Sequence, residues 1–483
     1  MNALVRHAKT VDALAQLKVR SSFLGKAELG AWCVSRLQDL GPTYVKIGQF
    51  VSSRQDIFGP EFSAPFAALR DSVRPIPPKE VAALIAAECD GSAFFSIDLE
   101  APLASASIGQ VHAAVLRDGK RVVIKVRRPG IEAVIREDVA FIYAALDVLT
   151  QLNGSSEDNY ADAVDMLRDV EAFLLQEVDF RREAAAMGAF GRQHAGDKDV
   201  RVPGVVAALC TDSVIVMERI DSRGLDTFIP TTNEERGADE RGERKRVALR
   251  VMDVFVSQLI DGGLVHGDPH SGNVGVDAAG RIVLYDFGNV ISLTREERQR
   301  MKEMIYLLLV GNNRAVSDSL KKLGVRILDE AAMSAYIDVY RDYMRTIDVG
   351  ALRSIGTYAG GGGGGGGPGD KVPLKLTDKF LRLIRVYGML EGTCKAIHPE
   401  FNYFDLLDDY IDDLFFDEEF LAFKVGEDVK LLRSGFNPFA PQAPPPPPQT
   451  PPTPPTPQKR KRGIDLKDLG YAALVAFAVL KSL

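Results

Sequence analysis

The stretch from Leu264 to Gly288 constrains the fold of this 483-residue chain more than any other. It reads as a polar loop, a short strand, a tight turn and a second apolar strand that ends in Asp-Phe-Gly. Three side chains with oxygen ligands stand in it, namely Asp268, Asn273 five positions later, and Asp286 at the end of the second strand. Mg²⁺ prefers a few hard oxygen ligands and keeps its other positions for water and phosphate. The stretch therefore predicts a β-hairpin that presents a divalent-cation site.

Protein kinases use the same arrangement of residues. In these enzymes the first Asp orients or deprotonates the acceptor, and the Asn and the second Asp hold magnesium on the nucleotide phosphates. On this pattern Asp268 is catalytic, Asn273 and Asp286 are the metal ligands, and the expected cofactors are ATP or ADP with Mg²⁺. The alternative is a loop with ordinary turn-forming Asp and Asn residues. The order of the motifs on one hairpin favours phosphoryl transfer.

Composition narrows the class of protein. A hydrophobic content of 46% and a charged content of 26% are ordinary for a soluble globular chain. A net charge of −7 gives no basic field for nucleic acid. The four cysteines form no CxxC pair, which argues against a zinc site or a disulfide framework and fits a reducing, intracellular compartment. No secretory signal peptide is evident, and the basic first residues fit a weak organelle-targeting presequence or, more simply, a solvated helix face.

An upstream hairpin offers the second half of a nucleotide site. Residues 101–116 are followed by Asp118-Gly119, which favours a hairpin turn, and by the β-branched run Arg121–Val126 with Lys125 near its end. Protein kinases keep a glycine-rich loop and a phosphate-binding lysine in such a hairpin. A plain amphipathic hairpin with a surface lysine is the alternative interpretation.

The loop before this hairpin departs from the glycine-rich pattern. Setting Val111 on the valine that closes the kinase loop places the first two glycine positions on Ala104 and Ala106, the third on Gly109 and the aromatic tip on Ile108. Alanine with φ > 0 costs roughly 1 kcal/mol or more, so we expect a stiffer loop that binds nucleotide but transfers poorly to a protein hydroxyl. The residues expected to bind ATP are Ala104, Ser105, Ala106, Ser107, Ile108, Gly109, Val111 and Lys125, with Met217 and Glu218 downstream.

Two long helices are predicted next, over Glu132–Leu152 and Asn159–Phe190. A kinase needs a helical Glu to pair with its phosphate lysine. Glu177 and Glu183 are both candidates for pairing with Lys125, and they point in different directions because six residues is not a whole number of helical turns. The pattern leaves the choice between them open.

The remaining elements of a large lobe follow in order. Ser213–Ile220 reads as a buried strand that ends in Met217-Glu218, where the hinge between two lobes and its backbone contacts to adenine are expected. Val247–Leu264 reads as an apolar helix that leads into the loop containing Asp268. Thr294, with a Glu three positions later, predicts a capped helix start.

The first part of the chain reads as helices. The pattern from residue 30 to 75 is helical and interrupted by Gly-Pro pairs, and another helix is predicted from Lys79 to Asp90. Lys46 and Gln49 lie three positions apart and project from one side of a helix. Taken alone, such a pair is usually surface.

The last part of the chain is biased in composition. A glycine run near residues 359–370 predicts a flexible insertion, and residues 436–458 form a Pro-rich spacer. Residues 459–483 combine a basic cluster with the apolar run Tyr471–Leu480, which is too short to span a bilayer. This tail fits a membrane-surface anchor. The alternatives are a nuclear-localisation-like patch and a helix that docks on protein.

With these motifs in place, the chain resembles the UbiB family of atypical kinases, also called AarF-domain kinases, over about residues 30–430. Ordinary protein kinases lack three of the marks that carry the resemblance. The marks are Lys46-Ile47-Gly48-Gln49, which matches the family's KxGQ; the alanine-rich loop at 104–107; Glu177-Val178-Asp179, which matches its ExD; His266–Asn273; and Asp286-Phe287-Gly288.

The resemblance implies that the KxGQ helix lies over the active site, with Lys46 and Gln49 facing the nucleotide opposite Glu177 and Asp179. Family members look like ATP-binding enzymes tied to isoprenoid-quinone biosynthesis or lipid homeostasis on membranes of bacteria, mitochondria and plastids. Lipid or quinone-pathway partners, peripheral membrane contact and a mitochondrial or plastid location are therefore expected. The chain departs from the family pattern at three positions, which are Ser105, Gly109 and Ser271.

The expected fold is α+β and two-lobed, like a protein kinase, with a five-stranded antiparallel small lobe, a helical large lobe and a helical extension over the cleft. The expected boundaries are 1–100 for the extension, 101–220 for the small lobe, 221–435 for the large lobe, 436–458 for the linker and 459–483 for the tail.

In this fold, Lys125 places the α- and β-phosphates, and Glu177 or Glu183 positions it. His270 occupies the position where protein kinases carry a catalytic lysine, and histidine is largely neutral near pH 7. We therefore expect slow hydrolysis or transfer to a small or lipid-like acceptor. The alternatives are a nucleotide-gated pseudokinase that acts as a binding module, and an ordinary protein or small-molecule kinase.

Overall fold

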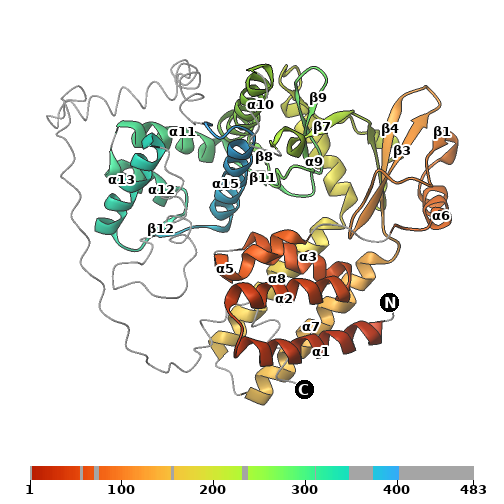
Figure 1. The fold of residues 1–483 in the computed structure, drawn as a ribbon, viewed down its shortest axis with the longest axis horizontal. Coiled ribbons are helices and arrows are strands. Elements are labelled where there is room, and N and C mark those ends of the chain that lie inside the picture. The colour runs from red at the N-terminus through yellow and green to blue at the C-terminus, as the bar shows by residue number, and fades with distance from the viewer. Residues whose placement is uncertain are drawn as a thin grey trace.

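The computed structural model describes residues 3–54, 58–69, 75–153, 157–230, 238–310, 312–346 and 374–401. The glycine-rich insertion, the Pro-rich linker and the basic tail lie outside the described residues. The described chain forms the predicted two-lobed, kinase-like fold with an N-terminal helical extension (Figure 1). Among the described residues, no helix is both long and apolar enough to cross a membrane.

The small lobe is a five-stranded antiparallel sheet, as predicted. Its hairpin turns at Gly119, which has a φ of 86°, and its register places Lys125 opposite Val111. The sheet begins before the boundary expected at residue 101. The expected boundary came too late because the first strand lacks the alternating pattern that reveals a strand in a sequence. The strands are β1 (Phe94–Ile97), β2 (Ala104–Ser105), β3 (Gly109–Leu116), β4 (Arg121–Arg127) and β6 (Val214–Glu218), and α6 (Pro78–Glu88) packs beside β4.

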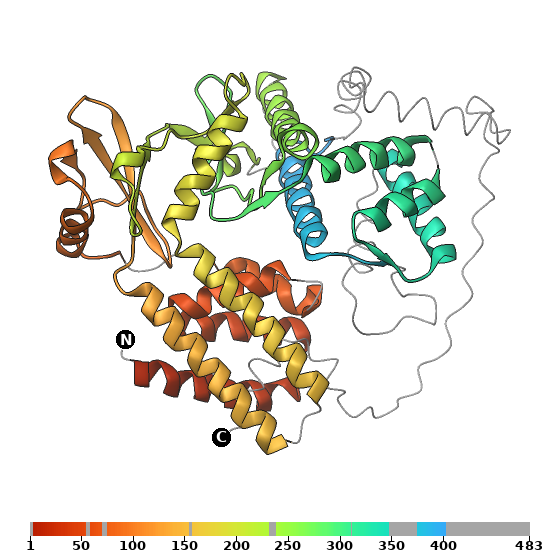
Figure 2. The ribbon, with the colours of Figure 1, turned by 180° about the vertical axis from the view of Figure 1, so that it is seen from behind.

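The extension forms a helical bundle with two later helices. These later helices, α7 (Ile131–Asn153) and α8 (Glu157–Glu177), were expected to belong to the small lobe, but they lie side by side with the N-terminal helices in both ribbon views (Figures 1 and 2). Contacts between α1 and α7 and between α3 and α8 confirm this packing. The bundle's N-terminal members are α1 (Ala3–Ser21), α2 (Lys26–Leu40), α3 (Pro42–Ser53) and α5 (Pro60–Ser63).

The burial pattern of α7 explains its position. Ile135, Val139, Ile142 and Leu146 are all buried and recur every three or four residues, so they form one apolar stripe. Such a stripe must pack against another element, and the N-terminal helices provide it.

The helix predicted over Asn159–Phe190 is two helices in the structure. α8 ends at Glu177, and α9 (Phe180–Gln193) begins after a break at Asp179. The Asp179 side chain accepts a hydrogen bond of 3.0 Å from the backbone N–H of Arg182 and so caps α9. Asp179 is therefore the N-cap of a second helix, which could not be recognised because the helical periodicity of the sequence continues through it.

The large lobe carries the predicted hairpin, β9 (Val274–Asp277) and β10 (Ile282–Leu284), which pair antiparallel. They lie in a sheet with β5 (Val200–Arg201) and β7 (Ser222–Gly224), while β8 (Leu264–His266) pairs with β11 (Val290–Ser292). The helix expected at Val247–Leu264 is α10 (Ala238–Ser257), followed by a π-helical turn at Gln258–Gly262. Its charged first half lies at the surface and lacks the apolar periodicity that marks a helix in sequence.

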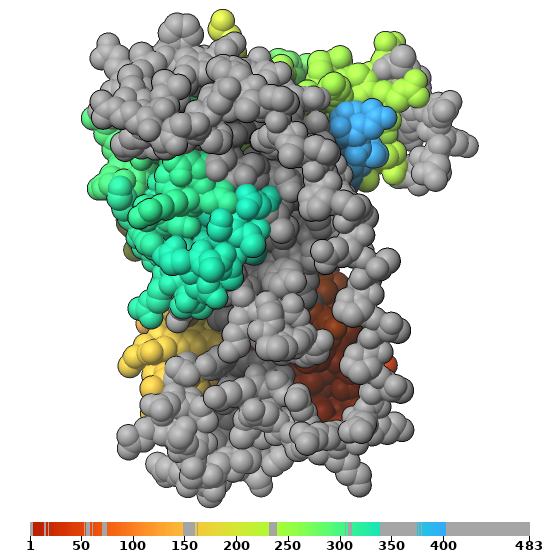
Figure 3. Space-filling view, turned by 90° about the vertical axis from the view of Figure 1, so that its left-hand side faces the viewer, coloured from red at the N-terminus to blue at the C-terminus, as the bar shows by residue number. Residues whose placement is uncertain are grey.

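The remaining helices close the lobe. The predicted capping box is present, because Thr294 Oγ1 accepts from the Glu297 N–H at 3.1 Å and a Glu297 carboxylate oxygen accepts from the Thr294 N–H at 2.8 Å. Figure 3 shows α13 on the face of this lobe that lies opposite the small lobe. The elements are α11 (Arg295–Val310), α12 (Asn313–Lys322), β12 (Arg326–Ile327), α13 (Glu330–Thr346), β13 (Leu374–Lys375) and α15 (Asp378–Ile397).

Candidate active site

A buried histidine joins the two strands that carry the predicted catalytic residues. His266 is fully buried, and its ring lies edge-on to Phe190, Phe255 and Phe287. Its Nε2 lies 2.8 Å from the carbonyl oxygens of both Tyr285 and Asp286. Two carbonyl acceptors require a proton on Nε2, and burial lowers the pKa of this imidazole, so the ring is a neutral donor. The histidine thereby ties the loop containing Asp268 to the Asp-Phe-Gly segment.

Asp268 and Asn273 lie next to each other in the loop after His266. The Asn273 side-chain nitrogen donates to the Asp268 carbonyl at 3.1 Å, and the Asn273 carbonyl accepts from the Tyr285 N–H at 2.8 Å. With the amide nitrogen used, the Oδ1 of Asn273 is the atom left to bind a cation. His270 accepts from the Gly272 N–H at 3.0 Å through Nδ1, and its Nε2 lies 3.9 Å from an Asp268 carboxylate oxygen.

Asp286 has a strained backbone. Its φ of 53° makes it the only non-glycine residue with positive φ in the described part of the chain. A non-glycine residue in this region costs roughly 1–2 kcal/mol, and such strain is typical of functional sites. One carboxylate oxygen accepts from the Gly288 N–H at 3.1 Å, and the other lies 3.3 Å from Lys125 Nζ. Desolvation favours the neutral acid, but Lys125, the Gly288 N–H and Lys46 hold the pKa of Asp286 well below its usual range.

Glu183 is the partner of Lys125, which resolves the choice that the sequence left open. The Lys125 ammonium lies 2.6 and 2.8 Å from the two Glu183 oxygens, and the Glu183 side chain is only 4% exposed. Burial raises the pKa of Glu183 to about 7, although Lys125 opposes the shift. Burial also disfavours the ammonium, but Asp286 and Glu183 together raise the pKa of Lys125. Lys125 therefore stays charged between Glu183 and Asp286.

Glu177 pairs with the extension instead. Lys46 Nζ lies 3.0 Å from a Glu177 oxygen, and the two side chains are 12% and 23% exposed. The Gln49 side chain donates to the Leu69 carbonyl at 3.2 Å. Lys46 lies at the same end of the cleft as Asp286, whose pKa it helps to lower. Asp179, the third acid in this region, is exposed and caps α9.

The alanine-rich loop is folded back on the small lobe. Ala104 pairs with Val111, and the Ala106 N–H donates to the Gly109 carbonyl at 2.8 Å, which closes a tight turn. Neither alanine has positive φ. The loop therefore avoids the backbone strain of an alanine with positive φ, and its shape differs from that of a loop whose glycines adopt positive φ. Ser107 and Ile108 are buried, and Ile108, which was aligned with the aromatic tip of the kinase loop, packs in the core.

Two features of this loop were not found from the sequence. A Cβ on Gly109 would lie 2.8 Å from the Val126 carbonyl oxygen, so this strand position has no room for a side chain. Arg128 holds the loop through three bonds: its N–H donates to the Ile108 carbonyl at 2.8 Å, its Nε to the Ala106 carbonyl at 2.9 Å and its Nη2 to Ser105 Oγ at 3.0 Å. An arginine before a Pro-Gly turn gives no sequence signal of such a role.

The hinge lies at the end of β6. Met217 is buried and pairs with Val123, and Glu218 accepts from Arg201 Nη2 at 2.5 Å. Arg201 also lies 3.8 Å from the Asp277 carboxylate, so it links the hinge to the β9–β10 hairpin. The adenine contacts expected here stay a prediction.

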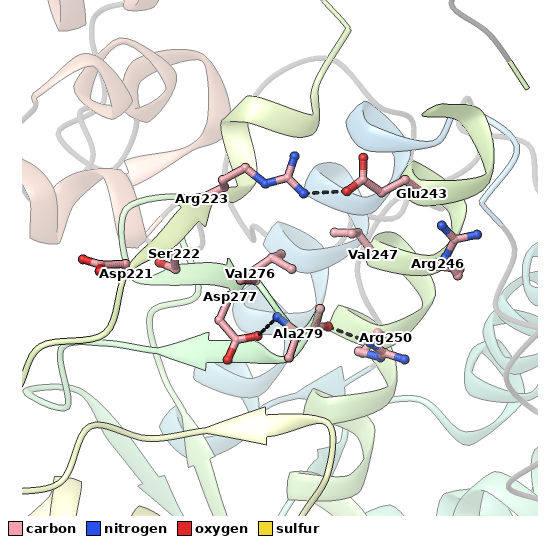
Figure 4. A pocket seen from close by; sticks show the side chains of 12 residues that line it. Asp221, Ser222, Arg223, Glu243, Arg246, Val247, Arg250, Val276, Asp277 and Ala279 are labelled. Atoms are coloured by element: carbon pink, nitrogen blue, oxygen red, sulfur yellow. Dashed lines mark hydrogen bonds and ion pairs between the residues drawn. The ribbon is translucent and has the colours of Figure 1, made fainter. Parts of the chain in front are cut away.

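A separate pocket of about 620 Å³ lies on the large lobe, between the start of α10 and the β9–β10 turn (Figure 4). Arg223 pairs with Glu243 at 2.5 Å, and Arg250 donates to the Gly280 carbonyl at 2.6 Å. These charged side chains are thus engaged in contacts within the protein. None of Lys125, Asp268, Asn273 and Asp286 lines the pocket. It is not the predicted nucleotide site.

The residues brought together fit a magnesium-bound nucleotide. Within the described ranges, no group of three or more His, Cys, Asp or Glu side chains is placed to hold a metal by itself. Mg²⁺ usually takes only one or two protein carboxylates, with water and phosphate oxygens in the other positions. The Asp286 carboxylate and the Asn273 Oδ1, beside an ammonium suited to phosphate, are a donor set of this kind.

Known proteins with similar sequences carry the same domain. Residues 68–320, just over half of the chain, match the ABC1 atypical kinase-like domain. The chain is 34% identical over 288 residues to a probable protein kinase UbiB of Pseudomonas putida, a match that covers 58% of this chain and 52% of that protein. It therefore spans about half the length of that relative. An uncharacterised protein of Mycobacterium tuberculosis is 33% identical over 370 residues, which cover 75% of this chain and 73% of that protein.

A solved structure supports the fold. The Rv3197–erythromycin complex from Mycobacterium tuberculosis superimposes with a TM-score of 0.52 and 22% identity, covering 67% of this chain and 80% of that chain. At this identity the likeness concerns the fold alone. The match of residues 68–320 to the family model, together with the clustering of Lys125, Glu183 and Asp286, shows that the chain belongs to the family of ABC1 atypical kinase-like proteins.

Proposed function

We propose that this protein binds Mg²⁺–nucleotide in the cleft between Lys125 and Asp286 and acts as an atypical kinase or ATPase. The observation that carries the proposal is the position of the Lys125 ammonium, 2.6 Å from Glu183 and 3.3 Å from Asp286. Phosphoryl transfer needs a lysine on the phosphates and an Asp on the metal within one site. A structural salt bridge would not require a third member with a strained backbone.

The roles of the side chains follow from their contacts. Lys125, fixed by Glu183, binds phosphate oxygens, and Asn273 Oδ1 and Asp286 hold the metal. Bound Mg²⁺ supplies charge neutralisation at the phosphate oxygens. Asp268 accepts a hydrogen bond from the attacking hydroxyl or water and orients it. His270, whose Nδ1 accepts from the Gly272 N–H, stands where protein kinases carry a catalytic lysine.

We further propose that the acceptor is water or a small or lipid-like molecule in isoprenoid-quinone or lipid metabolism at a membrane. Two observations support this. The Lys46–Glu177 pair places the extension at the end of the cleft near Asp286, which narrows the space for a peptide. The alanine-rich loop is held down by Arg128 instead of being free to close over a large substrate. The compartment and the partner proteins stay predictions.

The test is thermal unfolding with ADP, ATP or GTP, each with and without Mg²⁺. A ligand at 100 times its Kd adds about 2.7 kcal/mol of stability, so we expect a clear rise in Tm that needs Mg²⁺ and is lost in Lys125→Ala. The matched control is Lys120→Ala, in the same hairpin, whose exposed lysine contacts only Asp118. Stabilisation that persists in Lys125→Ala, or that no nucleotide produces in the unchanged protein, would refute the proposal.

A further inference from the structure

Helix α15 reaches the catalytic loop from a part of the chain far away in sequence. Arg382 Nη2 donates to Asn289 Oδ1 at 2.5 Å and approaches the Val290 carbonyl at 3.3 Å. Asn289 directly follows the Asp-Phe-Gly segment. One guanidinium thus connects α15 to the segment that carries Asp286.

Asn289 connects this segment to the residue before Asp268. Its Nδ2 donates to the Gly267 carbonyl at 3.0 Å, and its own carbonyl accepts from the Gly267 N–H at 2.8 Å. The fit is tight, because a Cβ on Gly267 would lie 2.6 Å from Asn289 Oδ1. Arg385 of α15 also approaches the Gly267 carbonyl, at 3.4 Å. The backbone between Asp268 and Asp286 is therefore bridged by one amide that an arginine holds in place.

The helix that carries Arg382 is itself firmly seated. Val386 and Leu390 are fully buried, and the Tyr387 hydroxyl donates to the Phe255 carbonyl at 2.6 Å. Lys379, three residues before Arg382 on the same helix, pairs with Glu297 at 2.7 Å. Because α15 is fixed by this packing, the groups that its side chains bind are also held in place, including the loop that contains Asp268.

We propose that Arg382 is a positioning residue that holds Asn289 against Gly267 and so sets the separation of Asp268 from Asp286. The inference rests on the proposed function, because it concerns the acceptor-orienting and metal-binding Asp residues of that site. Without Arg382 the Asn289 amide is held less firmly against Gly267, and the spacing of the two Asp residues, which the His266 contacts with Tyr285 and Asp286 also support, is fixed less precisely. Misplacement of reacting groups by about 1 Å costs on the order of 100-fold in rate.

The bond geometry explains why an arginine is needed. Two acceptors, the Asn289 amide oxygen and the Val290 carbonyl, lie within reach of one planar guanidinium, which presents its N–H groups in a fixed fork. Nη2 makes both contacts, and the planar guanidinium fixes the directions of its two N–H bonds, whereas the lysine ammonium rotates freely on a shorter side chain and would hold the two acceptors less well. The expected order of turnover is therefore wild type, then Arg382→Lys, then Arg382→Ala.

Kinetics of nucleotide hydrolysis test the proposal. For Arg382→Ala we expect kcat for ATP hydrolysis to fall at least tenfold while KM changes less than twofold, because Lys125 and Glu183 are untouched. Asn289→Asp keeps the oxygen that Arg382 binds but loses the donor to Gly267, and is expected to lower kcat similarly. Arg382→Ala combined with Asn289→Ala should be no slower than Asn289→Ala alone, since both act through one contact.

Lys379→Ala is the matched control, because it removes an ion pair of the same helix away from the loop and should leave kcat and KM within twofold of the wild type. Amide hydrogen exchange over residues 264–268 gives a readout independent of activity, and should be faster in Arg382→Ala than in Lys379→Ala. Equal kcat and equal exchange in these two variants would overturn the inference. If Arg382→Ala fails to fold, Arg382→Lys and the near-isosteric Asn289→Asp decide in its place.

Failure of the proposed function would look different. The wild-type protein would then show no Mg²⁺-dependent stabilisation by nucleotide, whereas the exchange difference between Arg382→Ala and Lys379→Ala would still appear if the loop is held as described. Loss of that exchange difference in a protein that binds nucleotide would remove the inference alone.

Discussion

Two lysine–glutamate pairs lie at the same cleft, and they differ in what they connect. Lys125 and Glu183 join a strand of the small lobe to α9, with both glutamate oxygens engaged and the carboxylate almost fully buried. Lys46 and Glu177 join the extension to α8, with more exposure at the glutamate. The same two residue types thus form a nearly buried pair beside Asp286 in one place, where we propose that the lysine binds phosphate, and connect the extension to α8 in the other. Burial and connectivity decide the role, not the pair itself.

The largest difference is expected when each glutamate is neutralised. Glu183→Gln leaves Lys125 without its charged partner, so we expect the rate of ATP hydrolysis to fall on the order of 100-fold, as when one preorganised charge-stabilising group is removed. Glu177→Gln should change the rate by less than about fivefold, because it touches no phosphate-binding group. Steady-state kinetics on both variants measure this, and equal losses would abolish the distinction between the pairs.

The pH dependence should separate them next. Burial raises the pKa of Glu183 to about 7, so its carboxylate is charged above that pH and becomes protonated as the pH falls through it. Protonation removes the negative partner of Lys125, and kcat/KM for ATP should therefore decline on the acid side of pH 7. A pH profile of Glu183→Gln should lack this limb, whereas Glu177→Gln should retain it. An acid limb that survives in Glu183→Gln would assign it to another group.

Stability should respond more modestly at the second pair. Glu177→Gln leaves the Lys46 ammonium at 12% exposure without its carboxylate, and we expect a loss of about 1–2 kcal/mol in the free energy of unfolding. The charge-reversed double variant Lys46→Glu with Glu177→Lys should recover part of that loss. Urea denaturation measures the free energy of unfolding of the double variant and of the single variants Lys46→Glu and Glu177→Lys. A loss in the double variant as large as the sum of the two single losses would indicate that the pair is not coupled.

The smallest effect is expected at Gln49, whose side chain donates a hydrogen bond to the Leu69 carbonyl. Gln49→Ala should cost about 0.5–1.5 kcal/mol of stability, the usual value for one hydrogen bond. It should leave hydrolysis unchanged, because this bond joins two parts of the extension, α3 and the chain just after Phe66. Thermal unfolding and a rate measurement suffice, and a rate loss as large as that of Glu183→Gln would place Gln49 in the site itself.

The sequence allowed the catalytic hairpin and the strand with Lys125 to be predicted because both rest on local patterns. Turn residues, alternating burial and the spacing from Asp268 to Asn273 are readable without knowing what packs on them. These are the parts where neighbours along the chain decide the structure. The five strands of the small lobe were expected from the likeness to protein kinases, since the first strand shows no alternating pattern in the sequence.

The choice between Glu177 and Glu183 was not predictable, because it depends on a break at Asp179 that helical periodicity hides. The charged first half of α10 was missed for the opposite reason, since an exposed helix shows no apolar stripe. Arg128 and Arg382 act across distances in sequence that no local pattern covers. Adenine contacts at Met217 and Glu218 and the identity of the acceptor remain predictions.

The position of α7 and α8 has a consequence for what can fold alone. They follow the strand that carries Lys125 and precede the helix that carries Glu183, yet their apolar faces pack on the N-terminal helices. A shortened chain limited to residues 68–320 would leave Ile135, Val139 and Ile142 facing solvent and would also lack α15. The smallest autonomous unit is therefore larger than the recognisable domain, and proteolytic trimming of either flank should end in aggregation before it ends in a minimal enzyme.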